Sequence, residues 1–529
     1  MKNTTFPLYI LSWLSTAWIH ATLIHAHPAI PVLTLPDQEI VRAFEKAAGQ
    51  NVLAAVNDSV FFGYFSVCAD GQGFGYANTY PSLDGHQMSD ALLWLGESAI
   101  VKANWDYVLT FQKPDGSLPL AILPAQAGRT IGPPAAQAAV EANGGLYHHW
   151  VPGDPLRALA GPTLIQNADV IYRFTQDRIW LIKQLPAVNR SAEYLAALTT
   201  AEGAVAGAGY YIERPCRQEY DGVAQCHAVD AFRRLAQLNR EIGAQATAQR
   251  FQNLAERSKI YFCSRFWQKD HFAEYIHPQH GLIDRHGLTD VNWCALALSL
   301  ADRRQAALLW PLLKNEYRFY YGGMPSGIAT LPGSYEAWEF TFPDQMDLAA
   351  MGRVWYLEAW ARANMQDGPG LLNSILAVCR EGEKNGYYWR ERYQEQGGYG
   401  AQQYCEYPAN LIRIVERFLL GVDLQLDGSL RLAPTVPDHW WIQGFGQTIG
   451  LQDWHLQYRM QQDQISGRFS GESDRTLWIR LPEHLTNKKW SAQLQGRPVK
   501  LKQVGNTLCL TLPKTDRLAS IRFAITAHG

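Results

Sequence analysis

The chain has 529 residues, and at about 150 residues per domain this length allows several domains or one large repetitive domain with an addition. Lysine and arginine number 47 against 49 aspartate and glutamate, without a basic run, which argues against a nucleic-acid partner. Aromatic residues make up 12% of the chain, and this excess suits stacking against a neutral, hydroxyl-rich ligand.

Residues 1–26 carry one lysine followed by an apolar run that only serine, threonine and histidine interrupt. This pattern predicts a signal peptide with cleavage after Ala26, and hence a periplasmic or secreted protein whose mature chain begins near His27. The run is too broken for a transmembrane anchor, and no later apolar run has spanning length. We therefore expect no stable membrane insertion.

Residues 37–420 show apolar side chains at helical spacing. This periodicity predicts about twelve helices, which tend to come in pairs, at 38–49, 86–96, 98–112, 167–184, 187–200, 224–242, 245–267, 289–301, 303–317, 345–364, 367–381 and 403–420. Residues 50–80 are candidates for a few additional strands. After Gly421 the pattern changes to short alternating runs between turn residues, which predicts an antiparallel β-sandwich over residues 421–529. The sequence thus predicts a mainly α protein with a C-terminal β-sandwich domain.

The segment YPSLDGHQMSDALLW begins the second predicted helix and is rich in polar side chains. Asp84 and Asp90 bracket His86 and Gln87. Carboxylates at a helix N-terminus cap free N–H groups and interact favourably with the helix dipole, which would explain them structurally. The same four side chains, with aromatic residues nearby, also suit hydrogen bonds to sugar hydroxyls. Both interpretations stay open, and the four are candidate substrate-binding residues.

Other side chains are candidates for contacts with a ring-shaped ligand, although each alone is more typical of a core. They are the aromatic residues Tyr147, Trp150, Trp293, Trp338 and Trp389, with His148 and His149 as possible hydroxyl ligands. The adjacent histidines lack zinc-helix spacing, and there is no phosphate loop or GxSxG elbow, so we expect no metal and no cofactor. The eight cysteines form no CxxC pair; Cys216 and Cys226 could form a disulfide or remain buried thiols.

Two loops place carboxylates ahead of long helices. In GYYIERPCRQEYDG, Glu219 and Asp221 precede a strongly periodic helix, although an Asp-Gly pair is also a common turn or N-cap. In GSYEAWEFTFPDQMD, Glu336, Trp338 and Glu339 precede another helix. Loops that open at one end of a helical fold could bring such carboxyl groups together.

The stretch from Glu381 to Leu420 is the most informative part of the chain. Glu391 lies among aromatic residues, and a glycine-rich turn, Gly397 to Gly400, follows it before an amphipathic helix. Aromatic faces suit the C–H faces of sugars, and glycines allow the backbone to approach a ligand closely. This combination indicates the rim of a sugar-cleaving site; an ordinary aromatic loop with a solvated glutamate is the alternative.

Paired helices with an attached β-sandwich resemble the six-hairpin (α/α)6-barrel glycosidases, which include trehalases, α-L-rhamnosidases and processing α-glucosidases. The segment RERYQEQGGYGAQQYCEYP is similar to the trehalase motif of Glu-Lys-Tyr, a glycine-rich run and Gly-Glu-Tyr-Pro. Arg392 replaces the lysine, the glycine run is shorter, and Cys405 stands where the last glycine would be. The resemblance implies an (α/α)6 six-hairpin toroid.

The resemblance also implies roles for the carboxylates. Glu391 takes the place of the catalytic base, with Arg392 beside it, and Glu339 is the runner-up because rhamnosidase-like enzymes carry a Trp-Glu pair in a comparable loop. Asp221 is similar in placement to the general acid, with Glu219 as its nearest rival. Inverting hydrolysis needs two such carboxyl groups roughly 6.5–9.5 Å apart.

These observations predict an exported glycoside hydrolase that removes a terminal sugar with inversion and takes a carbohydrate substrate. A polysaccharide lyase, phosphorylase or isomerase on the same barrel is an alternative, although no basic cluster for a uronic acid stands out in the loops. A carbohydrate-binding protein without activity is another. The sequence does not indicate an oligomeric state.

Overall fold

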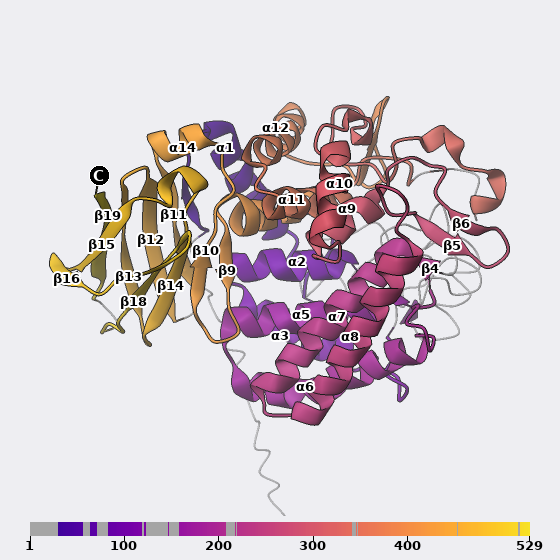
Figure 1. The fold of residues 1–529 in the computed structure, drawn as a ribbon, viewed down its shortest axis with the longest axis horizontal. Coiled ribbons are helices and arrows are strands. Elements are labelled where there is room, and N and C mark those ends of the chain that lie inside the picture. The colour runs from indigo at the N-terminus through magenta and orange to yellow at the C-terminus, as the bar shows by residue number, and fades with distance from the viewer. Residues whose placement is uncertain are drawn as a thin grey trace, which may run out of the picture.

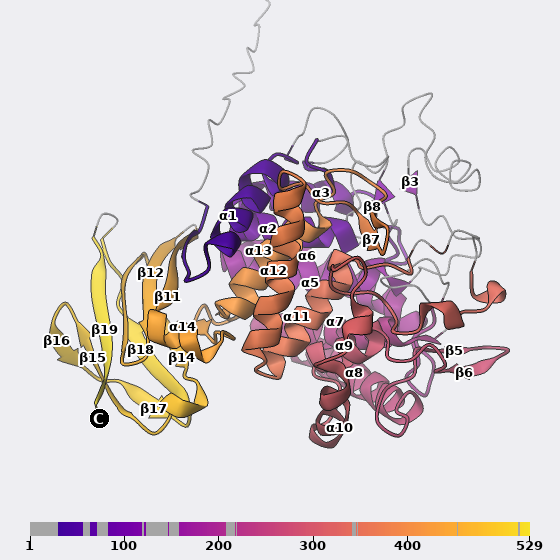
Figure 2. The same cartoon turned by 90° about the horizontal axis from the view of Figure 1, so that it is seen from above.

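The computed structural model describes residues 30–56, 64–70, 83–118, 121–122, 146–147, 158–207, 217, 220–340, 345, 347–451, 453–516 and 519–528, with only the backbone described at 121–122 and 146–147. A helical region and a β-rich region lie next to each other (Figures 1 and 2). The predicted mainly α region, followed by a strand-rich C-terminal region, is thereby confirmed.

The helices alternate along the chain between two groups. One group is α2 (Leu83–Trp94), α5 (Ala160–Thr175), α7 (Gly222–Glu241), α9 (Asp290–Ala297), α11 (Gly352–Asn364) and α13 (Glu406–Ile414). The other is α1 (Gln38–Lys46), α3 (Ser98–Leu109), α6 (Arg178–Ala197), α8 (Gln245–Arg265), α10 (Arg303–Leu313) and α12 (Gly368–Lys384). The π-helical segments η1 (Ala47–Val52) and η6 (Val415–Leu419) extend α1 and α13.

Helices of the first group contact one another in a closed sequence. Each of α2, α5, α7, α9, α11 and α13 contacts the next, and α13 returns to α2. Helices of the second group pack outside this ring: α8 lies along α7, α6 along α5, and α12 along α1 and α11. The ring helices are buried over most of their surface, whereas α8 and α10 each bury one face only.

Some predicted helix boundaries are wrong. The segment 167–184 was predicted as one helix, but Gln176 adopts a left-handed conformation and ends α5. Asp177 then caps α6 by accepting the N–H of Trp180. Apolar periodicity continues across this break and hides it. The helix predicted at 345–364 begins only at Gly352, because Met351 is extended.

Two sheets form the β-rich region. The order in the first is β1-β11-β12-β13-β19-β15-β16, and in the second β17-β18-β14-β10-β9. Their strands are β1 (Val32–Thr34), β9 (Val422–Leu424), β10 (Leu430–Leu432), β11 (Phe445–Leu451), β12 (Trp454–Gln461), β13 (Gln464–Gly471), β14 (Arg475–Arg480), β15 (Lys489–Leu494), β16 (Arg497–Val499), β17 (Lys502–Val504), β18 (Thr507–Leu512) and β19 (Ile521–His528). Alternate residues of β12 and β14 are buried, as expected for sheets that cover a common core.

Two details of the sheets differ from the prediction. Strand β1, from the N-terminal part of the chain, pairs with β11, so the β-rich region includes residues outside 421–529. Strands β10 and β14 run parallel, so the pairing is not antiparallel throughout. The short helix α14 (Asp438–Gln443) lies in the chain between β10 of the second sheet and β11 of the first. Within the described ranges, no helix combines the length and hydropathy that crossing a bilayer requires.

The β-rich region contacts the helical region at the C-terminal ends of α5 and α13. Arg173 of α5 donates to the carbonyl of Leu424 at 3.0 Å, and Gln447 of β11 donates to Glu416 at 2.8 Å. At the connection, Gly421 has φ +69° and a Cβ there would lie 2.1 Å from a backbone carbon of Ala433, so glycine is required. The two regions are therefore joined by specific polar contacts as well as by the chain.

Glu416 gives this junction a predictable pH response. Burial raises the pKa of Glu416 to about 8, and its Oε1 has no hydrogen-bond partner among the described residues. The folded protein keeps this carboxyl group protonated up to about pH 8, whereas the unfolded chain loses the proton at a pKa of about 4.3. The free energy of unfolding should therefore fall as the pH rises from about 4.5 to about 8. We expect Glu416→Gln to remove this component, on the order of a few kcal/mol. Thermal melts at about pH 5 and pH 8 measure it, and the exposed Glu483→Gln serves as control; equal slopes in variant and parent would contradict it.

Candidate active site

The N-terminal ends of the ring helices carry several carboxylate side chains, among them Asp84 and Asp221, which the sequence predicted as site residues. Asp84 lies in the first turn of α2, Asp221 is the N-cap of α7, Asp290 begins α9 and Glu406 begins α13. Helix dipoles make this a favourable end for carboxylates. Isolated backbone bridges, Thr289 to Ala329, Gly327 to Ala350 and Ala350 to Tyr393, connect the loops between α9, α11 and α13 at this end.

A first group of charges, the Arg217 cluster, joins α7 to α9. The guanidinium of Arg217 pairs with Glu274 at 2.7 Å, with Asp290 at 2.8 Å and with Asp221 at 3.4 Å. All four side chains are buried. Three carboxyl groups thus share one cation, and the pKa of Asp290 is raised to about 6, chiefly by burial and against the effect of Arg217. The Arg217 cluster can therefore hold a proton near neutral pH.

Asp221 is also a structural residue. Its carboxylate accepts the N–H groups of Val223 at 3.4 Å and Ala224 at 3.0 Å, which is the geometry of an N-cap. Both interpretations of the Asp-Gly pair thus have a physical basis in the same side chain: it caps α7 and it belongs to a cluster of carboxyl groups.

Glu339 extends the Arg217 cluster outward. It accepts the backbone N–H of Glu336 at 2.7 Å and pairs with Arg285 at 2.9 Å, and His286 lies 3.3 Å away. Burial alone would raise the pKa of Glu339, but hydrogen bonds from His286, the Glu336 N–H and Tyr275 lower it to about 2. Glu339 is therefore ionised at any physiological pH and fully engaged with donors.

A second group, the Glu391 cluster, lies at the turn before α13. Glu391 accepts the N–H of Ala401 at 3.0 Å and pairs with Arg392, which also pairs with Asp347 at 2.8 Å. Gly400 has φ +76°, and a Cβ there would lie 2.6 Å from an oxygen of Glu391. The glycine-rich turn thus allows the backbone to approach this carboxylate closely.

Asp84 and Arg353 connect the Glu391 cluster to α2 and α11. Arg353 pairs with Glu406 at 2.9 Å and lies 3.9 Å from Asp84. Burial raises the pKa of Asp84, and the charge of Glu391 acts in the same direction, against Arg353 and a hydrogen bond from Tyr404. This end of the ring thus holds both an acid that resists ionisation and a carboxylate with charged and N–H donors.

The other predicted binding residues lie elsewhere. His86, Gln87 and Asp90 face an interior cavity between the ring helices, where Asp90 pairs with Arg413 at 2.7 Å and Arg417 at 2.6 Å. The aromatic residues predicted to contact a ring-shaped ligand include both buried and exposed side chains.

Trp293 and Trp389 are buried: Trp293 packs against Trp310, and Trp389 donates to the carbonyl of Val378. Trp338 is exposed and stacks on His280 at 3.9 Å, and its indole N–H donates to Glu336 at 2.5 Å.

Several predictions fall on residues of which the structure describes no side chain. Glu219, His148 and Trp150 lie outside the described residues, and only the backbone of Tyr147, in strand β3 (Leu146–Tyr147), is described. Cys216 also lies outside them, so the predicted disulfide does too; Cys226 is a buried thiol next to Cys294.

Sequence reasoning missed Arg217, Asp290 and Arg353, on which the two clusters depend. Each contacts partners far away in sequence, up to 73 residues for Arg217 with Asp290 and 53 for Arg353 with Glu406. The only available signal was local: Arg217 stands four residues before Asp221 in the same loop. A single sequence gives no means of pairing the others.

No family model matches the sequence, and no curated protein matches it. Solved structures do share its fold. An α-L-rhamnosidase from Dictyoglumus thermophilum is 12% identical over 95% of this chain and 51% of that one, with a TM-score of 0.55. A GH78 rhamnosidase from Bacillus sp. GL1 is 13% identical over 86% and 43%, with a TM-score of 0.59.

A smaller protein matches over its whole length. The GH63 mannosylglycerate hydrolase from Thermus thermophilus, solved in complex with Tris, is 13% identical over 70% of this chain and 99% of its own, with a TM-score of 0.52. In contrast, the chain spans about half the length of the rhamnosidases that it matches. At these identities the likeness concerns the fold.

Proposed function

We propose that this protein is an exported, inverting glycoside hydrolase that removes a terminal sugar from an oligosaccharide or glycoside. Its fold would be the six-hairpin (α/α)6 barrel, which the closed ring of α2, α5, α7, α9, α11 and α13 supports. The fold-level likeness to rhamnosidases and to a mannosylglycerate hydrolase supports the reaction class by analogy only.

One observation carries the proposal. Two groups of buried carboxyl groups occur at the N-terminal ends of one ring of helices: the Arg217 cluster, in which the pKa of Asp290 is raised to about 6, and the Glu391 cluster, in which Arg392 and the Ala401 N–H hold the carboxylate. Inverting hydrolysis requires this asymmetry, because one carboxyl group must donate a proton while another must accept one.

In the proposed mechanism, Glu391 is the general base. It is held by Arg392 and the Ala401 N–H, and it would take a proton from a water that attacks the anomeric carbon. Asp221 is the general acid: it would protonate the oxygen of the leaving group as the glycosidic bond breaks. Asp290, on the same arginine, would keep a proton available to Asp221 near neutral pH.

The remaining groups would bind and orient the sugar. Asp84, with its raised pKa, could donate a hydrogen bond to a hydroxyl group as a neutral acid. Arg392 would hold Glu391 in position through its second ion pair with Asp347. Glu339 is saturated with donors, and we assign it to organising Arg285 and His286 rather than to activating water.

A panel of aryl glycosides and natural oligosaccharides, followed by NMR at early times, tests the proposal. We expect release of a terminal sugar whose first-formed anomer is opposite to that of the substrate, and no product trapped by azide, because no glycosyl-enzyme forms. Retention of configuration would rule out the inverting mechanism. Saturable sugar binding without any turnover would instead indicate a binding protein that lacks activity.

A further inference from the structure

A second feature runs through the interior of the ring, from Leu83 and Arg353 at the N-terminal ends of α2 and α11 to the junction with the β-rich region. A cavity of about 500 Å³ is lined there by α2, α5, α7, α11, α13 and η6, together with β9, β10 and the end of β14. It opens along α7 and β10 into a second hollow, which shares Arg173, Gln237 and Arg431 with it. Of the residues that line the cavity, Arg353 also contacts Asp84 and Glu406 of the candidate active site, and the catalytic proposal uses none of the others.

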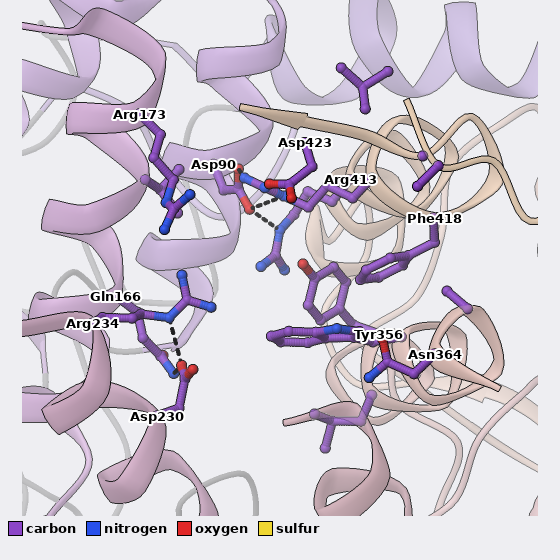
Figure 3. Close-up of a pocket in the computed structure, with 18 of the residues that line it drawn as sticks. Asp90, Gln166, Arg173, Asp230, Arg234, Tyr356, Asn364, Arg413, Phe418 and Asp423 are labelled. Carbon is purple, nitrogen blue, oxygen red and sulfur yellow. Dashed lines mark hydrogen bonds and ion pairs between the residues drawn. The ribbon is translucent and has the colours of Figure 1, made fainter. Parts of the chain in front are cut away.

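The walls of this cavity differ in chemistry. Figure 3 shows Arg173 and Arg234 on one side and Tyr356 and Phe418 on the other, with open space between them. The aromatic side is organised: Trp360 stacks on Phe418 at 5.9 Å. One wall thus offers guanidinium groups and the other offers aromatic rings, of which Tyr356 carries the guanidinium of Arg413 at 3.7 Å from its centroid.

Positive charge exceeds negative charge in this lining. Eight arginines line the cavity, against three aspartates, Asp90, Asp230 and Asp423. Among the described residues, Arg233, Arg431 and Arg480 form no ion pair with a carboxylate, and Arg480 instead donates to the carbonyl of Ala433 at 2.9 Å. Burial and the neighbouring charge of Arg431 lower the pKa of Arg480 to about 10. Arg431 and Arg480 are therefore neighbouring cations that form no ion pair with a carboxylate of the described residues, although Asp423 lies opposite Arg431 on β9.

The structure assigns to this cavity a second ligand site, for a small anionic sugar: the carboxylate or phosphate of the ligand would contact Arg431 and Arg480, and its ring would lie against the aromatic side at Trp360. Arginine suits such anions because its fork donates two parallel hydrogen bonds. Aromatic faces suit the C–H face of a sugar ring. Gln87, whose Nε2 is buried and has no partner among the described residues, would donate to a hydroxyl group at the deep end.

Isothermal titration of the full-length protein tests the site at fixed ionic strength. The probes are D-glucuronate, glucose 6-phosphate and inorganic phosphate, with glucose and chloride as neutral and simple-anion controls. We expect saturable binding of one molecule of an anionic sugar, with weaker binding of phosphate and none of glucose or chloride. Preference for glucuronate or for glucose 6-phosphate identifies the anion as a carboxylate or a phosphate.

Substitutions of residues that line the cavity test whether the anionic sugar binds there. Arg431→Ala and Arg480→Gln should each weaken it roughly tenfold, since each loses a charge-assisted hydrogen bond. Gln237→Trp should block the mouth, where this exposed side chain lines both hollows. The matched control is Arg497→Ala, which removes an exposed arginine of β16 and should leave binding unchanged. Glu391→Gln should bind the anion as the parent protein does, and this result would show that the anion site is separate from the catalytic site.

Two outcomes would overturn the proposal: no saturable binding of any anionic sugar by the parent protein, or binding that Arg431→Ala, Arg480→Gln and Gln237→Trp leave unchanged. Melting temperatures of the variants check that the junction remains folded. If Arg480→Gln proves unstable, Arg431→Ala and Gln237→Trp decide, because both residues are exposed.

Discussion

Replacing Glu391 by glutamine is expected to lower turnover on a hydrolysed glycoside by a factor on the order of 10² or more, because an amide cannot accept the proton of the attacking water. Glutamine keeps the shape of the side chain and can still accept the N–H of Ala401. The fold and the affinity for product should therefore change little. Steady-state kinetics, product titration and circular dichroism measure the three quantities.

A matched control and a rival variant sharpen this test. Glu395→Gln removes an exposed carboxylate four residues away and should leave turnover unchanged. Glu339→Gln tests the runner-up base. Near-full turnover in Glu391→Gln together with loss in Glu339→Gln would move the base to Glu339, and unchanged turnover in both would contradict the hydrolase proposal itself.

Replacing Asp221 by asparagine is expected to reduce turnover by a similar factor, but only for glycosides with a poor leaving group. A leaving group such as dinitrophenolate departs without protonation, so its hydrolysis should be affected far less. Asparagine caps helices about as well as aspartate, and α7 should therefore keep its N-terminus. The ratio of kcat between alkyl and dinitrophenyl glycosides is the measurement.

The neighbours of Asp221 provide the controls. Asp302→Asn changes the N-cap of α10 in the same chemical way, away from both clusters, and should have no effect on turnover. Asp290→Asn removes the like charge beside Asp221, so the alkaline limb of the pH–rate profile should move to lower pH. An equal loss of kcat by Asp221→Asn for all leaving groups would show that this residue acts only through the fold.

The sequence predicted the helical region and the strand-rich region because both patterns are local. The i, i+3/i+4 spacing along α7 and the alternation in β12 each depend on a few neighbouring residues. Features that depend on distant residues, or on the backbone conformation of a single residue, were missed. The pairing of β1 with β11 joins segments at opposite ends of the chain, and the end of α5 depends on a single left-handed residue, Gln176.

The same distinction holds for the candidate site. Glu391 and its glycines were identifiable because the turn that positions the carboxylate follows it directly in sequence. The assignment of Asp90 to sugar binding rested on its position near a helix start. In the structure Asp90 pairs with Arg413 and Arg417, which lie 323 and 327 residues further along the chain. No local sequence pattern predicts these pairs. The roles of Asp221, Glu339 and Asp84 remain predictions that the variants above can test.

The closure of the helical ring by α2 and α13 has a consequence for biogenesis. Gln87 and Asp90 of α2 bond to Asn410 and Arg413 of α13, and each pair is separated by 323 residues. At synthesis rates of about 5–20 residues per second, α2 waits roughly 15–65 s on the ribosome before its partner emerges. During that time its buried face, which includes the unpaired charge of Asp90, has no native partner. We therefore expect nascent chains to depend on chaperones until the last ring helix is made, and late truncations to aggregate rather than to fold partially.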